Sequence, residues 1–161
     1  MRRPLRILLI VLGVVLFLAI SGVLARFLSV ENAEREDDLV LLKAQAAGNV
    51  TGMLRQLHGC SERPVCVAAV KTNAADPRLR RLGAVKILQL TSPTAYSLTG
   101  ATGQTRLAWT VIGKLPVVQC VEVQRTGNFL TGIHVELVGL SGPIANEGEC
   151  SPHPKNEEEE L

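Results

Sequence analysis

The hydrophobic pattern begins with an unbroken apolar run. Residues 7–25 carry no charge, and Ser21 is their only polar side chain. In a helix this run spans about 28 Å, close to the hydrocarbon thickness of a bilayer. Three arginines precede the run and Arg26 follows it, a bias that favours a cytoplasmic N-terminus. We therefore predict that residues 1–26 anchor the chain in the lipid bilayer of the cell membrane as a single-pass helix.

A cleaved signal peptide is the alternative interpretation of the same segment. Val23, Leu24 and Ala25 provide small residues for cleavage after Ala25. The run is longer than the usual signal-peptide core of about 7–15 residues, which favours the anchor. A buried soluble helix is disfavoured because the segment has no polar face. Both remaining interpretations place residues 27–161 outside the cytoplasm, either tethered or secreted.

Helical spacing follows the apolar run. Residues 31–47 predict a helix capped by Ser29, with acidic residues near its start. Its predicted apolar stripe consists of Val30, Ala33, Val40, Leu41 and Ala44. Gly48 suits the end of this helix. Asn49 fits both an N-glycosylation acceptor and a cap for the next helix, and we favour the cap.

Two further helices and their breaks are predicted before the pattern changes. A short helix covers residues 50–57 and ends at Gly59. Pro64 suits the first turn of a third helix that runs to about residue 74. Asp76 and Pro77 break it, and a basic linker follows.

From Val85 the period becomes two, which is typical of strands. Strands are predicted over residues 85–90, 95–98, 105–112 and 117–125, with a last strand from about 133 that Gly142-Pro143 ends, and with breaks at 100–103 and 126–128. One face should carry Leu107, Trp109, Val111, Val121, Val123, Val135 and Leu137. The short connections predict an antiparallel meander. The predicted fold is α+β over residues 27–150, with two to three helices on one face of a curved sheet of four to five strands.

The four cysteines all follow the apolar run. An even number in an exported domain predicts two disulfides, with three pairings open in principle. Cys60 and Cys66 flank a turn-like stretch, so we favour their local closure. Cys120 should lie on the sheet face away from the helices, where the C-terminal segment can bring Cys150. A metal site is disfavoured because no close Cys-x-x-Cys pair is present, and we expect no cofactor.

Charge divides the chain unevenly. The formal net charge is +2, but residues 151–161 contain four consecutive glutamates and read as an acidic, disordered tail. Aromatic residues make up 3% of the chain, which argues against nucleic-acid binding. The densest basic cluster consists of Arg78, Arg80, Arg81 and Lys86. It suits anionic lipid headgroups or an acidic partner, or it is simply a solvated linker.

The three helices, the break at Ala46-Ala47-Gly48-Asn49-Val50 and the following sheet resemble the cone-shaped superfamily of nuclear transport factor two and its SnoaL-like relatives. In that resemblance Met53, Leu54 and Leu57 match a short helix rich in leucine. The chain also resembles single-pass exported proteins of actinobacteria. The superfamily includes isomerases, dehydratases, ligand binders and parts of secretion machines. Its enzymes usually carry an acid/base pair in the cone, and no such pair is matched in this chain.

Candidate chemistry is therefore sparse. His134 and Glu136 share one strand face, where such a pair can perform acid–base work or bind a metal, or simply face solvent. With Tyr96 and Trp109 they would line a cone pocket. Our first hypothesis is a non-enzymatic, membrane-anchored interaction or scaffold module with an envelope protein partner. The alternatives are a ligand-binding or enzymatic domain that uses the cone pocket, and a purely structural domain.

Overall fold

A computed structural model describes residues 2–92, 99–128, 132–145 and 150. The described elements are three α-helices, one 3-10 turn and a four-stranded antiparallel sheet in the order β1-β2-β3-β4. The helices are α1 (Arg2–Ala46), α2 (Val50–Gln56) and α3 (Pro64–Ala75), with η1 (Cys60–Glu62) between the last two. The strands are β1 (Val85–Thr91), β2 (Thr99–Val111), β3 (Val117–Asn128) and β4 (Gly132–Leu140). The α+β prediction is confirmed.

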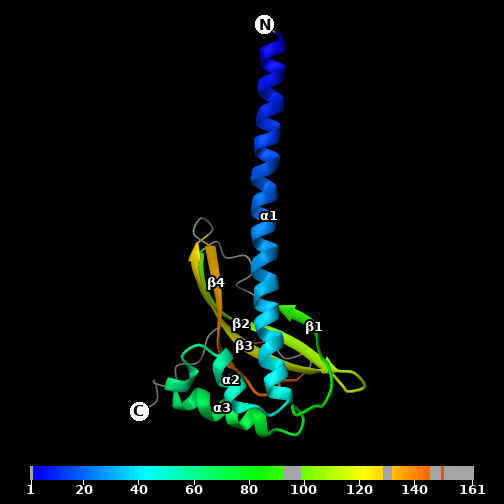
Figure 1. The fold of residues 1–161 in the computed structure, drawn as a ribbon, viewed down its shortest axis with the longest axis vertical. Helices are drawn as coiled ribbons and strands as arrows, with labels where there is room; N and C mark the ends of the chain where they lie inside the picture. Colours follow the sequence, from blue (N-terminus) through cyan, green and yellow to red (C-terminus); the bar gives the residue numbers. More distant parts are fainter. Residues whose placement is uncertain (1, 93–98, 129–131, 146–149, 151–161) are drawn as a thin grey trace.

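The longest element is α1, which runs straight out of the domain (Figure 1). Its 45 residues include the apolar segment Ile7–Ala25, which is long and apolar enough to cross a membrane and of which nothing is buried in the protein. The prediction of a separate helix that begins near Ser29 is wrong. The backbone stays helical through Ser29, and no proline or glycine between Gly22 and Gly48 interrupts it.

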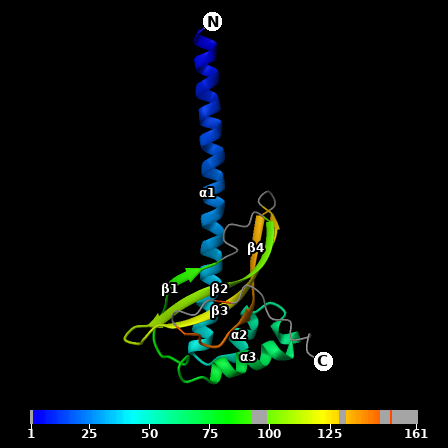
Figure 2. The same cartoon turned by 180° about the vertical axis from the view of Figure 1, so that it is seen from behind.

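The last four turns of α1 lie across the concave face of the sheet, as both views show (Figures 1 and 2). The predicted apolar stripe is confirmed in part: Leu41 is buried and Ala44 packs against the core, whereas Val40 is 40% exposed and Ala33 is exposed. The buried side chains of this part of α1 are Glu34, Asp38, Leu41, Leu42, Gln45 and Ala46. Apolar spacing alone misplaced part of the stripe because two carboxyl groups and an amide occupy the buried face.

The break between α1 and α2 has the predicted chemistry. Gly48 has φ +68°, and a Cβ there would lie 2.9 Å from Nε of Arg80. The positive φ favours glycine at this position, and the Arg80 side chain packs against it. The side chain of Asn49 accepts a hydrogen bond from the Gly52 backbone N–H, so Asn49 caps α2.

Sheet pairing extends further than predicted. Residues 100–103 belong to β2 and residues 126–128 to β3, where the sequence had predicted breaks. Gly103 pairs with Val123 and Ala101 with Arg125. A Cβ at Gly100 would lie 3.0 Å from the Arg125 carbonyl oxygen, so a glycine here marks close strand approach rather than a turn. The predicted strand over residues 95–98 lies outside the described residues.

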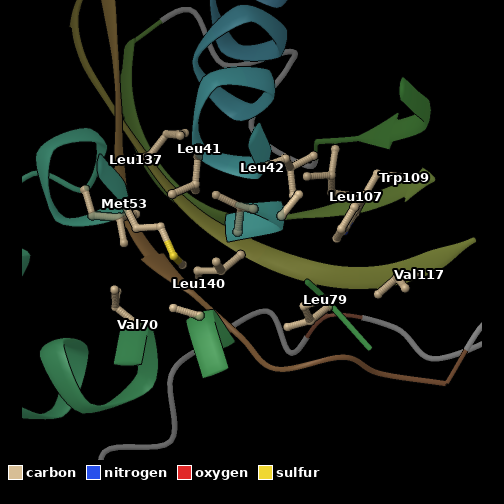
Figure 3. Packing of buried hydrophobic residues seen from close by; sticks show 14 of the residues in the cluster. Leu41, Leu42, Met53, Val70, Leu79, Leu107, Trp109, Val117, Leu137 and Leu140 are labelled. Atoms are coloured by element: carbon tan, nitrogen blue, oxygen red, sulfur yellow. The ribbon is translucent and has the colours of Figure 1, made fainter. Parts of the chain in front are cut away.

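The hydrophobic core fills the space between the helices and the concave sheet face. Figure 3 shows Leu42 of α1 beside Leu107 and Trp109 of β2, and Leu41 beside Leu137 of β4 and Met53 of α2, with Val70 of α3 on the same side as Met53. The face predicted from the strand alternation is confirmed: its members on β2, β3 and β4 are buried, with Val135 half-buried. Trp109 lies within this core and is fully buried.

Both predicted disulfides are present. Cys60 bonds Cys66 within one loop, and Cys120 bonds Cys150 across 30 residues. After β4 the chain continues beside β3, where the Ser141 and Ile144 N–H groups donate to the carbonyls of Cys120 and Val118. This route along the strand, rather than across the outer face as expected, brings the C-terminal segment to Cys120.

Candidate functional site

A buried ion pair fixes α1 to the sheet. Glu34 on α1 and Arg125 on β3 are 0% and 3% exposed, and Arg125 donates to Oε2 of the Glu34 carboxylate. The Thr105 hydroxyl on β2 donates to Oε1 of the same carboxylate at 2.6 Å. A buried charge is tolerated only when it is paired and hydrogen-bonded. These contacts therefore set the rotation of α1 about its axis relative to β2 and β3.

One turn further along the same helix face lies a second acid, Asp38. It is fully buried, and neither carboxyl oxygen has a hydrogen-bond partner among the described residues. Burial raises the pKa of Asp38 to about 8, with smaller contributions from the negative charges of Glu34 and Asp37. Asp38 is therefore mostly protonated at neutral pH, which avoids a second buried negative charge.

A second polar cluster lies deeper along the same helix. The Gln45 amide and the Trp109 indole N–H both donate to Oε1 of Gln119, at 2.9 and 2.8 Å. The Gln119 amide donates in turn to the Ser141 carbonyl at 2.9 Å. The network satisfies the buried indole and amides, so its function is to orient α1, β2 and β3.

The three described residues of the predicted cone pocket, Trp109, His134 and Glu136, do not form one site. Trp109 is in the core, whereas His134 is exposed near the opposite end of the sheet. Glu136 lies 4.0 Å from His58, a contact between largely exposed side chains at the surface. Tyr96 lies outside the described residues. The His134 and Glu136 pair thus sits on a solvent-facing strand, without a buried partner of the kind that tunes a catalytic acid.

The basic linker after α3 packs over the end of α1 that lies farthest from the apolar segment. The Arg81 N–H donates to the Ala46 carbonyl at 3.0 Å, and the Arg81 guanidinium lies 5.6 Å from the Trp109 ring centroid. Arg80 lies against Gly48. Cations at a helix C-terminus complement its partial negative charge. Arg81 is thus a cap and a core contact rather than a solvated linker residue.

This end of the domain, which we call the membrane-distal surface because it lies farthest along α1 from the candidate membrane span Ile7–Ala25, comprises residues 76–86 and 112–116 with the adjoining ends of α1 and α3. It contains a hollow of about 400 Å³. The hollow is lined by Ala46, Ala47, Ala75, Pro77, Arg80, Arg81 and Leu82. Figures 1 and 2 place these segments at the end of the molecule opposite the N-terminus.

Apolar side chains are also exposed on the membrane-distal surface. Leu82 is 96% exposed, and Ile112 and Leu115 on the turn between β2 and β3 are each 82% exposed. The two segments touch, since Arg81 donates a hydrogen bond to the Leu115 carbonyl. Exposed apolar groups gathered beside a hollow are typical of interaction sites.

Charge on the same surface is strongly one-sided. Its two segments carry five cations and one carboxylate, Asp76. Arg78 pairs with Asp76 at 2.7 Å, and this contact lowers the pKa of Asp76. The remaining exposed cations are Arg80, Lys86 and Lys114.

Comparisons with family models, with curated proteins and with solved structures find no match for the chain. The resemblance to the cone-shaped superfamily therefore stays a prediction.

A smaller hollow of about 290 Å³ lies between the start of α3 and the sheet. Arg63, Cys66, Cys120 and Glu122 are among its lining residues. The Arg63 guanidinium donates to the Val138 carbonyl, so its charge is engaged within the protein. The hollow lies beside both disulfides and is distinct from the predicted cone pocket.

Sequence reasoning found the basic cluster but missed the buried acids and Arg125. Alternation along β3 already places Arg125 on the same face as Val121 and Val123. An arginine at a core-facing strand position requires a buried acid partner. Arg125 therefore predicts that a residue of the acidic stretch before Leu39 is buried. Across the described residues, no group of three or more His, Cys, Asp or Glu side chains is arranged to hold a metal ion.

Proposed function

We propose that the chain is a membrane-anchored interaction module whose folded domain lies outside the cytoplasm and holds a binding surface at a fixed height above the bilayer. The observation that carries the proposal is the continuity of α1 from the apolar segment Ile7–Ala25 into the domain core. The 21 residues that follow Ala25, up to Ala46, span about 32 Å in a helix. No flexible linker separates the apolar segment from the domain, so the helix acts as a rigid spacer.

Two further observations support an extracytoplasmic domain. The arginine bias before the apolar segment favours a cytoplasmic N-terminus. Both disulfides suit an oxidising compartment. A scaffold or docking role in the cell envelope fits better than catalysis, because the buried polar groups are used to orient α1 and His134 is exposed to solvent.

Topology is tested with single cysteines introduced into the full chain in intact cells. Positions 4 and 86 are both exposed in the protein, so the membrane alone should decide which of them reacts. A membrane-impermeant maleimide should label Lys86→Cys in intact cells and should label Pro4→Cys only after the cells are opened. The native cysteines should remain unlabelled until they are reduced. The protein should also stay in the pellet after a carbonate wash.

Two results would contradict this proposal. Labelling of Pro4→Cys with protection of Lys86→Cys would reverse the orientation. Recovery of a soluble chain that begins at Arg26 would replace the anchor by a cleaved signal peptide.

A further inference from the structure

We propose that the membrane-distal surface binds an acidic segment of a partner protein that inserts an apolar side chain into the 400 Å³ hollow. The proposal rests on the proposed function in one respect, the compartment from which the partner comes. The chemistry of the partner follows from the residues of the surface.

The hollow is lined by small apolar side chains that lie beside cations. Ala46, Ala75 and Pro77 contribute aliphatic surface where the C-terminal ends of α1 and α3 meet, and Leu82 adds a nearly fully exposed side chain. An apolar group placed there removes this surface from water, the main source of affinity at interface centres.

Charge identifies the rest of the partner. Arg80 lines the hollow, Lys86 and Lys114 are exposed on the same membrane-distal surface, and the sole carboxylate of the two segments is already paired with Arg78. Complementary potential requires carboxylates on the partner. Arg81, engaged with Ala46, Leu115 and Trp109, holds the linker in place so that Arg80 and Leu82 are presented on a rigid backbone.

Distance excludes the lipid that holds the chain as the occupant. The surface lies about 30 Å along α1 from the end of the apolar segment, and charges are screened over about 8 Å at physiological ionic strength. The headgroups around α1 are therefore out of reach. An acidic protein segment matches both the charge and the concave apolar surface.

Binding is tested with the full chain in nanodiscs and a fluorescent synthetic peptide in which glutamates alternate with leucines. Saturable binding is expected, weakened when salt rises from about 50 to about 300 mM. Arg80→Glu and Leu82→Glu should each weaken binding about tenfold or more, whereas the matched exposed controls Arg55→Glu and Val65→Glu should leave it unchanged. Emission from the buried Trp109 verifies that each variant is folded.

Peptide variants separate the two parts of the proposal. Replacing leucines by serines should weaken binding about tenfold, and replacing glutamates by lysines should abolish it. Equal binding by the serine peptide would overturn insertion into the hollow. Equal loss in the control variants would overturn the location.

Two other probes test different occupants. Tighter binding by single-stranded DNA, or by separate vesicles with about 30% anionic lipid, would overturn the assignment to a protein partner. A reversed topology in the labelling experiment with intact binding would overturn the proposed compartment and leave this surface chemistry standing.

Discussion

The two halves of α1 differ from the usual distribution of side chains, in which apolar groups are buried and polar groups are exposed. Residues 7–25 expose apolar side chains, with Phe17 68% exposed, and touch no other part of the described domain. Residues 34–46 bury Glu34, Asp38 and Gln45 against the sheet. The same helix thus carries apolar groups outside and polar groups inside.

The difference shows that each half is stabilised by a different environment. Apolar side chains without a protein partner are stable in a bilayer, where the surroundings are themselves apolar. Glu34 and Gln45 are stable there through Arg125, Thr105 and Gln119 on the sheet, and Asp38 is stable there because it keeps its proton. The stability of the first half therefore depends on the surrounding medium, and that of the second half on its contacts with the domain. Substitutions in each half can test this difference.

The largest effect is expected at the buried ion pair. Arg125→Ala leaves the Glu34 carboxylate buried without its cation and should lower the free energy of unfolding by about 3–5 kcal/mol. Denaturant titration of the full chain in detergent micelles, followed by Trp109 emission, measures this change.

The control for the ion pair is a double variant. Glu34→Leu with Arg125→Met removes both charges together and should recover most of the lost stability, since apolar replacement of a buried pair is often neutral or better. Arg55→Ala on the exposed surface of α2 should change stability by less than about 0.5 kcal/mol. If the double variant were no more stable than Arg125→Ala, packing rather than charge would explain the loss.

A smaller, pH-dependent effect is expected at Asp38. Its pKa is raised from 3.8 to about 8 in the folded protein, so the folded state keeps a proton that the unfolded chain releases. Stability contributed by this group is therefore lost as pH rises from about 4 to about 8, with a slope of up to about 1.4 kcal/mol per pH unit. Asp38→Asn cannot ionise and should flatten this slope in denaturant titrations between those pH values.

Asp37→Asn serves as the matched control, because Asp37 is only half-buried on the same helix. Burial and the charge of Glu36 also raise the pKa of Asp37, but it is largely hydrated. Its replacement should leave most of the slope in place. An unchanged slope in Asp38→Asn would show that its carboxyl group is hydrated or paired in solution.

Much of the fold follows from local chemistry in the sequence. Gly48, Asn49 and Pro64 mark helix ends because backbone conformation and capping act over a few residues. Alternation in β2 and β3 identifies the core-facing side because a strand has only two faces. These features need no knowledge of distant partners.

The candidate site was less predictable because the roles of its residues depend on contacts between positions far apart in the sequence. Glu34 meets Thr105 and Arg125 across 71 and 91 positions of the chain, and the acidic stretch around it resembles a solvated helix start. The basic linker was identified from composition. Its position over the end of α1, and hence its distance from the apolar segment, required the three-dimensional arrangement of Arg81 against Ala46.

The smallest effect is expected in the apolar half of α1. Phe17→Ala should leave the unfolding of the domain unchanged within about 0.5 kcal/mol, because Phe17 contacts no part of the core. Leu41→Ala, a truncation of a fully buried side chain in the other half of the same helix, should cost about 2–5 kcal/mol. Both are measured by Trp109 emission during denaturant titration in micelles. A loss of several kcal/mol in Phe17→Ala would mean that the apolar half packs on protein, in this chain or a second copy, and the contrast between the two halves would fail.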